Sequence, residues 1–233
     1  MNEIQCDVTK STKVLIKANA PAAKLSEPLY AINWFSTKAE WMYHLYNFLA
    51  SKSVLKIGGR AFFKGKITKT ILDESKAARE LILIVYYPSG NNFKALMEST
   101  YFKIVSLFRM LSVKDFSFGF TEKQLASTST LENNLAYVIH HFKTSTIDES
   151  FFSQFESLLG TSIKITYAGK MVAGLVTETK NKETEHIPNL MDGVVIFESE
   201  EESDILNLIA SPKYKSLIKT LDSSYIGTLK RIL

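Results

Sequence analysis

The sequence has little cysteine and no long hydrophobic run. Cys6 is the single cysteine among 233 residues, so the chain can form neither an internal disulfide nor a cysteine-rich metal site. No apolar stretch approaches the roughly 20 residues that cross a bilayer. The first residues also lack the basic and then apolar pattern of a secretory signal. We therefore expect a cytoplasmic protein in a reducing compartment, with no membrane as partner.

Charge of one sign is not concentrated in any segment. The formal net charge is +4 and the lysines are spread along the chain, without the basic stripe that follows a phosphate backbone. Nucleic acid is therefore not favoured as a partner. What the sequence does contain is 45% hydrophobic and 12% aromatic residues. That is enough to bury a core in one large domain or in two of about a hundred residues each.

Two segments of the chain resemble each other. Leu29–Phe35 and Leu135–Phe142 read as apolar strands, and each is followed by Thr-x-x-Glu, beginning at Thr37 and Thr146. A hydroxyl and a carboxylate at this spacing can satisfy the free N–H groups of a helix start. A helical apolar pattern then follows in each copy, formed by Trp41, Leu45, Phe48 and Leu49 in the first and by Phe151, Phe152, Phe155, Leu158 and Leu159 in the second.

More strands and a second helix follow in both copies. The expected strands are 54–65, 81–87 and 116–120 in the first copy and 163–169, 193–197 and 225–229 in the second. The second helices align at a constant separation, 112 positions between Phe93 and Ile205. Along this alignment the first three pairs stay apolar, and the last three, Ile104, Leu107 and Phe108 against Ser216, Lys219 and Thr220, lose that character in the second copy.

The order of elements in each copy is β-α-β-β-α-β, the ferredoxin-like split arrangement of the α+β class. We predict an N-terminal extension (1–28), a first repeat (29–123), a linker (124–134) and a second repeat (135–233). The apolar piece 14–16 of the extension could add an edge strand or stay loose.

The third strand of each copy shows how the two repeats should pack. Leu81–Val85 and Val194–Phe197 are apolar at every position, so both faces of each sheet must be covered. Helices can cover one face only. We therefore predict that the two antiparallel sheets pack together as an intrachain pseudo-dimeric α+β barrel, in a monomer or a homodimer.

Several short motifs resemble the dimeric α+β barrel superfamily. They are the stretches 58–65, with Gly-Gly-Arg, and 84–89, with Tyr-Pro-Ser, the helix 93–102, and Arg109. The nearest likeness is to a small uncharacterised branch of unknown function, and 211–214 keeps part of it in the second copy. The resemblance implies a tandem duplication. The superfamily includes cofactor-free monooxygenases, isomerases and haem-binding enzymes, so the likeness indicates fold more than function.

Seven residues are candidates for a ligand site. They are Asn33, Trp34, Arg60, Tyr86, Arg109, His140 and His141. Adjacent residues of a strand point to opposite faces, so the two histidines cannot share one metal, and a structural role is the more frequent one. Asn33-Trp34 align with His140-His141, which suggests a lined cavity. Arg60, Tyr86 and Arg109 could bind an anionic or carbonyl substrate, or could simply pair and fill core.

No cofactor or metal is expected. The sequence contains no Gly-x-Gly-x-x-Gly, no phosphate loop and no Ser-His-Asp signature. Carboxylates gather at the start of the second copy's second helix, but there they complement the helix dipole on a solvated face. This acidic group consists of Glu198, Glu200, Glu201, Glu202 and Asp204.

Three functions remain open from the sequence. The first is a barrel that binds a small apolar or aromatic ligand in a cavity bounded by Trp34, Tyr86 and the histidine strand. The second is a cofactor-independent monooxygenase or isomerase that uses Asn33, Trp34, His140 or Arg109. The third is a structural or RNA-binding module, and RNA binding would need Phe116, Phe118 and Phe120 exposed on an open sheet.

Overall fold

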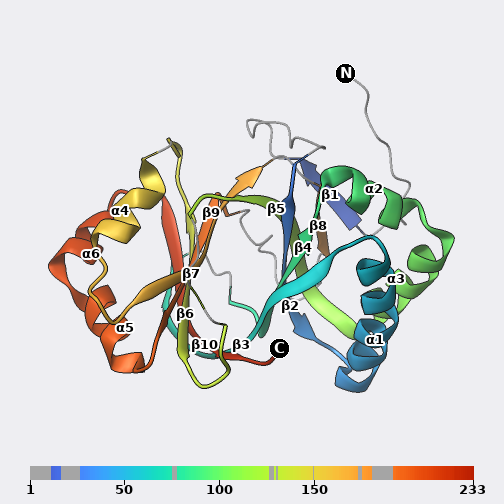
Figure 1. The fold of residues 1–233 in the computed structure, drawn as a ribbon, viewed down its shortest axis with the longest axis horizontal. Coiled ribbons are helices and arrows are strands. Elements are labelled where there is room, and N and C mark those ends of the chain that lie inside the picture. Colours follow the sequence, from blue (N-terminus) through green and yellow to red (C-terminus); the bar gives the residue numbers. More distant parts are fainter. Residues whose placement is uncertain are drawn as a thin grey trace.

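Eight antiparallel strands form a closed barrel, and helices cover its outer surface on two opposite sides (Figure 1). This computed structural model describes residues 12–16, 27–74, 78–125, 129, 131–148, 150–172, 175–179 and 191–233. The barrel strands are β2 (Leu29–Thr37), β3 (Arg60–Asp73), β4 (Leu81–Tyr87), β5 (Val113–Lys123), β6 (Ala136–Lys143), β7 (Lys164–Val172), β9 (Gly193–Ser199) and β10 (Ser223–Arg231). The helices are α1 (Glu40–Lys56), α2 (Gly90–Glu98), α3 (Thr100–Ser112), α4 (Phe151–Ser157), α5 (Glu202–Ala210) and α6 (Pro212–Ile218).

The strand order shows how the two repeats close on each other. Around the ring it is β10-β3-β4-β2-β5-β7-β9-β6. The first repeat contributes β3-β4-β2-β5 and the second contributes β7-β9-β6-β10. The last strand of each repeat pairs with the second strand of the other, at the β5–β7 and β10–β3 seams. The predicted pseudo-dimeric α+β barrel is therefore confirmed, and hydrogen-bonded edges hold the two sheets together.

A second, two-stranded sheet lies outside the barrel. Its strands are β1 (Thr12–Ile16) and β8 (Leu175–Thr179), which pair antiparallel. The apolar piece 14–16 thus forms a strand, one of the two alternatives that the sequence allowed. The partner strand β8 was not predicted, because its segment follows β7 in a stretch that reads as a charged loop.

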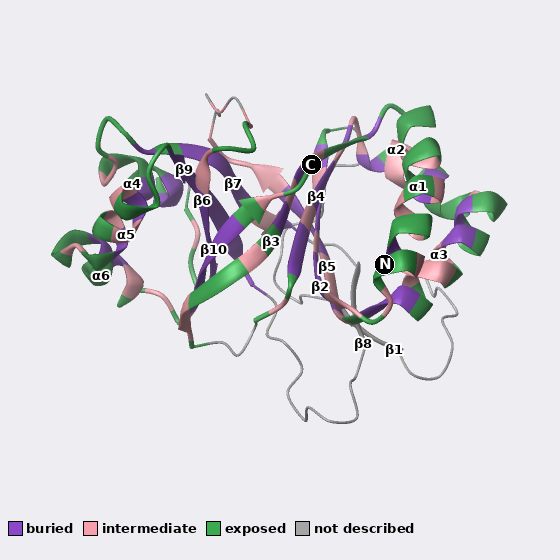
Figure 2. Ribbon diagram, turned by 90° about the horizontal axis from the view of Figure 1, so that it is seen from below, coloured by how far each residue is buried: buried purple, intermediate pink, exposed green. Residues whose placement is uncertain are grey.

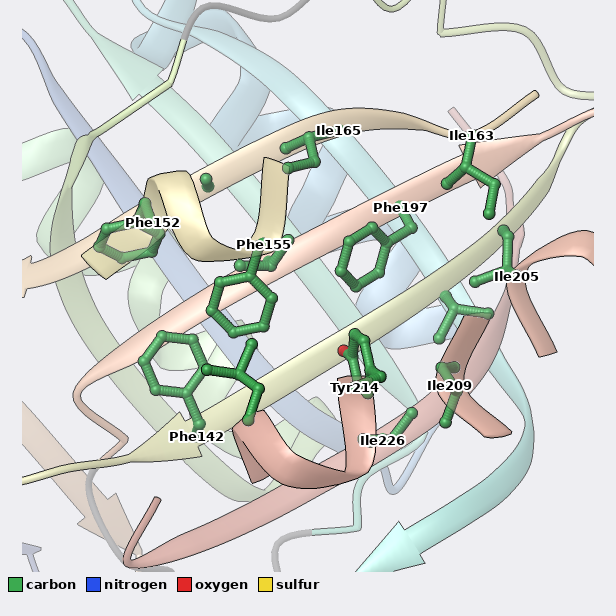
Figure 3. Packing of buried hydrophobic residues seen from close by; sticks show 14 of the residues in the cluster. Phe142, Phe152, Phe155, Ile163, Ile165, Phe197, Ile205, Ile209, Tyr214 and Ile226 are labelled. Atoms are coloured by element: carbon green, nitrogen blue, oxygen red, sulfur yellow. The ribbon is translucent and has the colours of Figure 1, made fainter. Parts of the chain in front are cut away.

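The core has an interior layer and two outer layers (Figure 2). Successive residues of each strand alternate between the barrel interior and the helices, so apolar runs such as Leu81–Val85 are covered on both sides. Under the second repeat's helices, aromatic rings fill the outer layer, among them Phe142, Phe155 and Tyr214 (Figure 3). Phe151, Phe152 and Phe155 are buried in α4, as the helical pattern predicted.

The first helix of the first repeat differs from the prediction. Trp41 and Phe48 are exposed, whereas Tyr43 and Ala50 are buried against the sheet. The helix also continues to Lys56, so the strand expected from residue 54 begins only at Arg60. The apolar spacing was read correctly as helical, and α1 carries large apolar residues on both its buried and its exposed side.

The predicted capping box of α1 is also wrong. The N-cap residue is Ala39, and no side chain caps this helix start. Thr37 instead donates both its backbone N–H and its hydroxyl to the Glu80 carboxylate, at 2.8 Å each. In the second repeat α4 begins at Phe151 rather than after Thr146, and Glu149 lies outside the described residues. A distant carboxylate therefore replaces the local Thr-x-x-Glu pair at the first site.

The expected second helix is broken in both repeats at the same place. Ser99 separates α2 from α3 and accepts a hydrogen bond from the backbone N–H of Phe102 at 3.5 Å. Ser211, 112 positions later, separates α5 from α6 and accepts one from Tyr214 at 3.2 Å. Two short helices therefore stand in each repeat where the sequence predicted one. None of the helices in the described ranges is long and apolar enough to span a membrane.

Candidate ligand site in the barrel interior

The structure places the seven candidate residues in three separate locations. Trp34 and His141 face each other inside the barrel. Arg60 and Tyr86 lie together at one end of it. The other three face the helix layers: Asn33, Arg109 and His140. Only the first pair forms an enclosed site.

Three aromatic side chains form what we call the interior site: Trp34, His141 and Tyr225. His141 and Tyr225 are cross-strand neighbours on β6 and β10. The Trp34 ring comes from β2, which lies opposite β6 in the ring of strands. Its centroid is 4.8 Å from that of His141 and 5.4 Å from that of Tyr225, both with edge-to-face geometry. Each repeat therefore supplies part of the site.

His141 has no hydrogen-bond partner, although it is deeply buried. Its side chain is 5% exposed, and both ring nitrogens, Nδ1 and Nε2, lack a partner. Burial lowers the pKa of His141 to about 3, so the ring is neutral at physiological pH. A neutral imidazole carries one donor and one acceptor nitrogen. The protein thus leaves both hydrogen-bonding groups unsatisfied at the centre of its barrel.

Small exposed fractions remain on some interior residues around His141. Trp34 and His141 keep 5% of their surface accessible and Met191 keeps 8%. The strand β5 contributes a small side chain here, since Ser117 pairs with Trp34. A small molecule reaching this part of the barrel would meet mostly aromatic and apolar surface.

His140 faces the opposite side of β6 and is fully satisfied. Its Nδ1 lies 2.8 Å from the Tyr214 hydroxyl and its Nε2 lies 3.1 Å from the Ser224 hydroxyl. Burial, and then the charge of the neighbouring His141, lower the pKa of His140 to about 3. The prediction that the two histidines point to opposite faces is confirmed. His140 joins β6, β10 and α6 within the outer core.

At one end of the barrel, Arg60 and Tyr86 belong to an aromatic group. The Arg60 guanidinium lies 4.9 Å from the centroid of the Tyr86 ring. Tyr30 contacts Tyr86 at 5.3 Å and Phe62 at 5.4 Å between ring centroids. Burial, and then Tyr86, raise the pKa of Tyr30, while Arg60 opposes them. Arg60 is exposed and Tyr86 is half-buried, so this group is a rim rather than an enclosed site.

Asn33 and Arg109 do not join either group. The Asn33 side-chain amide donates to the Leu83 carbonyl at 3.1 Å, which links β2 to β4. The Arg109 guanidinium lies 4.6 Å from the centroid of Phe116, between α3 and the sheet. Arg60 and Arg109 therefore contact different faces of the sheet and cannot hold one ligand together.

The acidic group divides differently from the prediction. Glu198 is buried on β9 and accepts hydrogen bonds from Thr166, at 2.8 Å, and from Ser129. It therefore does not belong to the solvated helix start, where Glu200, Glu201 and Glu202 are exposed. Within the residues that the structure describes, no group of three or more His, Cys, Asp or Glu side chains could hold a metal ion.

Sequence reasoning missed Tyr225 as a site residue. It lay within a predicted strand, but its neighbour His141 is set by the β6–β10 register, which links residues 84 positions apart. The repeat itself could have indicated it. In the first repeat β5 places Ser117 beside Trp34, and the equivalent strand of the second repeat, β10, places Tyr225 beside His141.

Comparison with known proteins identifies the fold. No family model matches the sequence, and no curated protein matches it. Among solved structures, a putative monooxygenase from Fusobacterium nucleatum is 10% identical, with a TM-score of 0.53 over 90% of this chain and 94% of that one. An anthrone oxidase-like protein is also 10% identical, with a TM-score of 0.53 over 89% and 92%. A mutant chlorite dismutase from Candidatus Nitrospira defluvii is 13% identical, with a TM-score of 0.50 over 88% and 92%.

Identities this low carry information about the fold alone. The three proteins match nearly the whole of this chain and are themselves matched over nearly their whole length. By these likenesses the chain is a tandem α+β protein with the same closed barrel fold as an anthrone oxidase-like protein and a chlorite dismutase.

Proposed function

We propose that this protein binds a small, mostly apolar aromatic molecule at the interior site, and that the molecule donates a hydrogen bond to His141. The observation that carries the proposal is the buried imidazole with two unpartnered nitrogens. Leaving a buried polar group unsatisfied costs about 1–3 kcal/mol. A ligand hydroxyl or N–H that reaches the acceptor nitrogen removes part of this cost, which gives binding a specific source of free energy.

The neighbours of His141 suit an aromatic ligand. The ring centroids of Trp34 and Tyr225 lie 5.4 Å apart in edge-to-face geometry, and such rings pack well against another ring. Small-molecule sites in proteins are mostly apolar with a few placed polar groups. A single imidazole among aromatic side chains matches that description.

A cofactor-independent monooxygenase or isomerase is the second candidate. It is supported by the neutral ring of His141, which is the state a general base needs, and by likeness in fold to a putative monooxygenase. The low pKa of His141, about 3, argues for binding over proton transfer, because so weak a base takes a proton poorly. RNA binding through an open sheet is disfavoured, since Phe116 and Phe120 are buried under helices.

The proposal is tested with phenol and toluene, which have nearly the same shape and differ in the hydroxyl. Nitrogen NMR of the histidine rings follows binding at His141 directly. We expect phenol to shift a His141 nitrogen signal and to bind at least about tenfold more tightly than toluene, a difference of about 1.4 kcal/mol. In His141→Leu the preference for phenol should disappear.

His140→Leu is the matched control, because it removes the adjacent imidazole on the other face of β6. It should keep the preference for phenol. The proposal is overturned if neither compound binds to the wild-type protein, or if the preference persists in His141→Leu.

A further inference from the structure

The two helix layers of this duplicated protein have very different outer surfaces. Six large apolar side chains of the first repeat's helices are each between 54% and 68% exposed. We call them the outer apolar face: Trp41, Phe48 and Leu55 of α1, with Ile104, Leu107 and Leu111 of α3. Among the described residues, the helices α4, α5 and α6 have no large apolar side chain exposed to this degree. The helix layer of the second repeat therefore shows what an ordinary solvated helix surface looks like on this fold, and the outer apolar face can be compared with it.

The spacing of these residues puts them on one side of each helix. Trp41, Phe48 and Leu55 recur every seven residues, and Ile104, Leu107 and Leu111 follow the i, i+3, i+7 pattern, so each set forms a stripe. The sheet-facing residues of the same helices are others, such as Tyr43 in α1 and Val105 in α3. Both stripes thus point away from the barrel.

The two stripes can touch one surface at the same time. The helices α1 and α3 pack side by side, and the Tyr101 hydroxyl donates to the Leu49 carbonyl at 3.5 Å. They form the outermost layer on their side of the molecule (Figure 1), and their outward surfaces are exposed (Figure 2). A broad, outward apolar face of this kind suits a flat partner better than an inserted peptide, which needs a groove.

Charges around the face are mainly positive. The helices α1 and α3 carry three exposed lysines, Lys52, Lys56 and Lys103, against one exposed carboxylate, Glu40. The Lys52 ammonium lies 4.3 Å from the centroid of the Phe48 ring, directly within the apolar stripe. Two copies of this face would bring like charges together, whereas an anionic surface would be attracted by these lysines.

From this surface we infer that the protein docks on an anionic lipid surface through α1 and α3. Exposed Trp and Phe on a helix with lysines beside them is the arrangement of helices that lie in the headgroup region. Each lysine near an anionic leaflet adds to the electrostatic attraction. The sequence-based expectation that no membrane is a partner depended on the lack of a spanning run, and surface docking needs none.

The two tryptophans give a direct test. Trp34 is buried in the barrel and Trp41 is exposed on the outer apolar face. With vesicles of equal parts phosphatidylglycerol and phosphatidylcholine, we expect the full chain to cosediment and the Trp41 emission to shift to the blue. Trp41→Phe should still cosediment but lose the shift. Vesicles of phosphatidylcholine alone should bind at least tenfold more weakly.

Variants assign the effect to the face. The pair Phe48→Ser and Leu107→Ser should weaken vesicle binding at least tenfold without changing the far-UV circular dichroism, since both side chains are exposed. Lys213→Glu is the matched control on exposed α6 of the other helix layer, and it should bind as the wild type does. The inference is overturned by absence of vesicle binding, by equal binding to both lipid compositions, or by a dimer that the Phe48→Ser, Leu107→Ser pair dissociates while vesicles bind nothing.

Discussion

The rings of Trp34 and His141 meet inside the barrel, with centroids 4.8 Å apart, and they come from equivalent positions of the two repeats. Trp34 pairs with Ile82 and Ser117 on its neighbouring strands, as His141 pairs with Val194 and Tyr225. The repeat therefore places equivalent positions of its two copies face to face inside the barrel. One copy supplies an indole ring and the other an imidazole whose two nitrogens have no hydrogen-bond partner.

The two adjacent histidines should respond in opposite ways to the same substitution. His141→Leu removes a buried polar ring with no partner, so we expect the free energy of unfolding to stay within about 1 kcal/mol of wild type or to rise. His140→Leu leaves the hydroxyls of Tyr214 and Ser224 buried without their partner, and should lower it by about 2–5 kcal/mol. Urea denaturation measures both. Equal losses would contradict the assignment of their roles.

Stability should fall with acidification before the carboxylates titrate. The folded pKa values of His140 and His141 are about 3, below the unfolded value of roughly 6.5, so between these pH values the unfolded chain binds protons that the folded chain refuses. The contribution of the two histidines to the free energy of unfolding is fully present above about pH 6.5. Below that pH it decreases by roughly 1.4 kcal/mol per pH unit for each histidine.

Denaturation between pH 7 and pH 5 tests this dependence, and His141→Leu is the informative variant. Its slope should be roughly half that of wild type, because one of the two buried imidazoles is gone. An unchanged slope in this variant, or a flat wild-type profile, would show that the rings accept protons in the folded state.

Glycine is required where an aromatic ring lies against the backbone. A Cβ added at Gly193 would lie 2.2 Å from Cζ of Phe142, a ring that is fully buried in the outer core. Gly193→Ala should therefore cost about 1–3 kcal/mol by overpacking. At Gly160 nothing lies within 4 Å of an added Cβ, so Gly160→Ala should change the melting temperature little. Similar losses in the two variants would contradict the role of the Phe142 contact.

The serines at the two helix breaks should contribute equally. Ser99 and Ser211 each accept a hydrogen bond from the first turn of the following helix. Replacing such a cap by alanine lowers the free energy of unfolding by about 1 kcal/mol. We expect Ser99→Ala and Ser211→Ala to lower stability by similar amounts, additively in the double variant. Ser203→Ala, at an exposed position within α5, is the control and should have little effect. Calorimetry of the four variants measures these losses. Widely different losses for Ser99→Ala and Ser211→Ala would show that other contacts fix one of the two helix breaks.

Predictions that depended on local sequence pattern were right, and those that a distant side chain could override were wrong. The strands around Leu81–Tyr87 and Gly193–Ser199 were predicted because a run apolar at every position needs cover on both faces. The α1 cap was mispredicted because Glu80, 43 residues away, takes both donors of Thr37.

The sequence by itself determined the duplication, the α+β class and the pairing of two sheets, since these follow from local periodicity and from apolar surface that must be buried. Tertiary structure alone decided which strand edges join at the two seams of the barrel, and that Trp34, His141 and Tyr225 meet inside it. Such meetings depend on strand register between segments far apart in the chain, and a shift of one residue would turn each side chain to the other face.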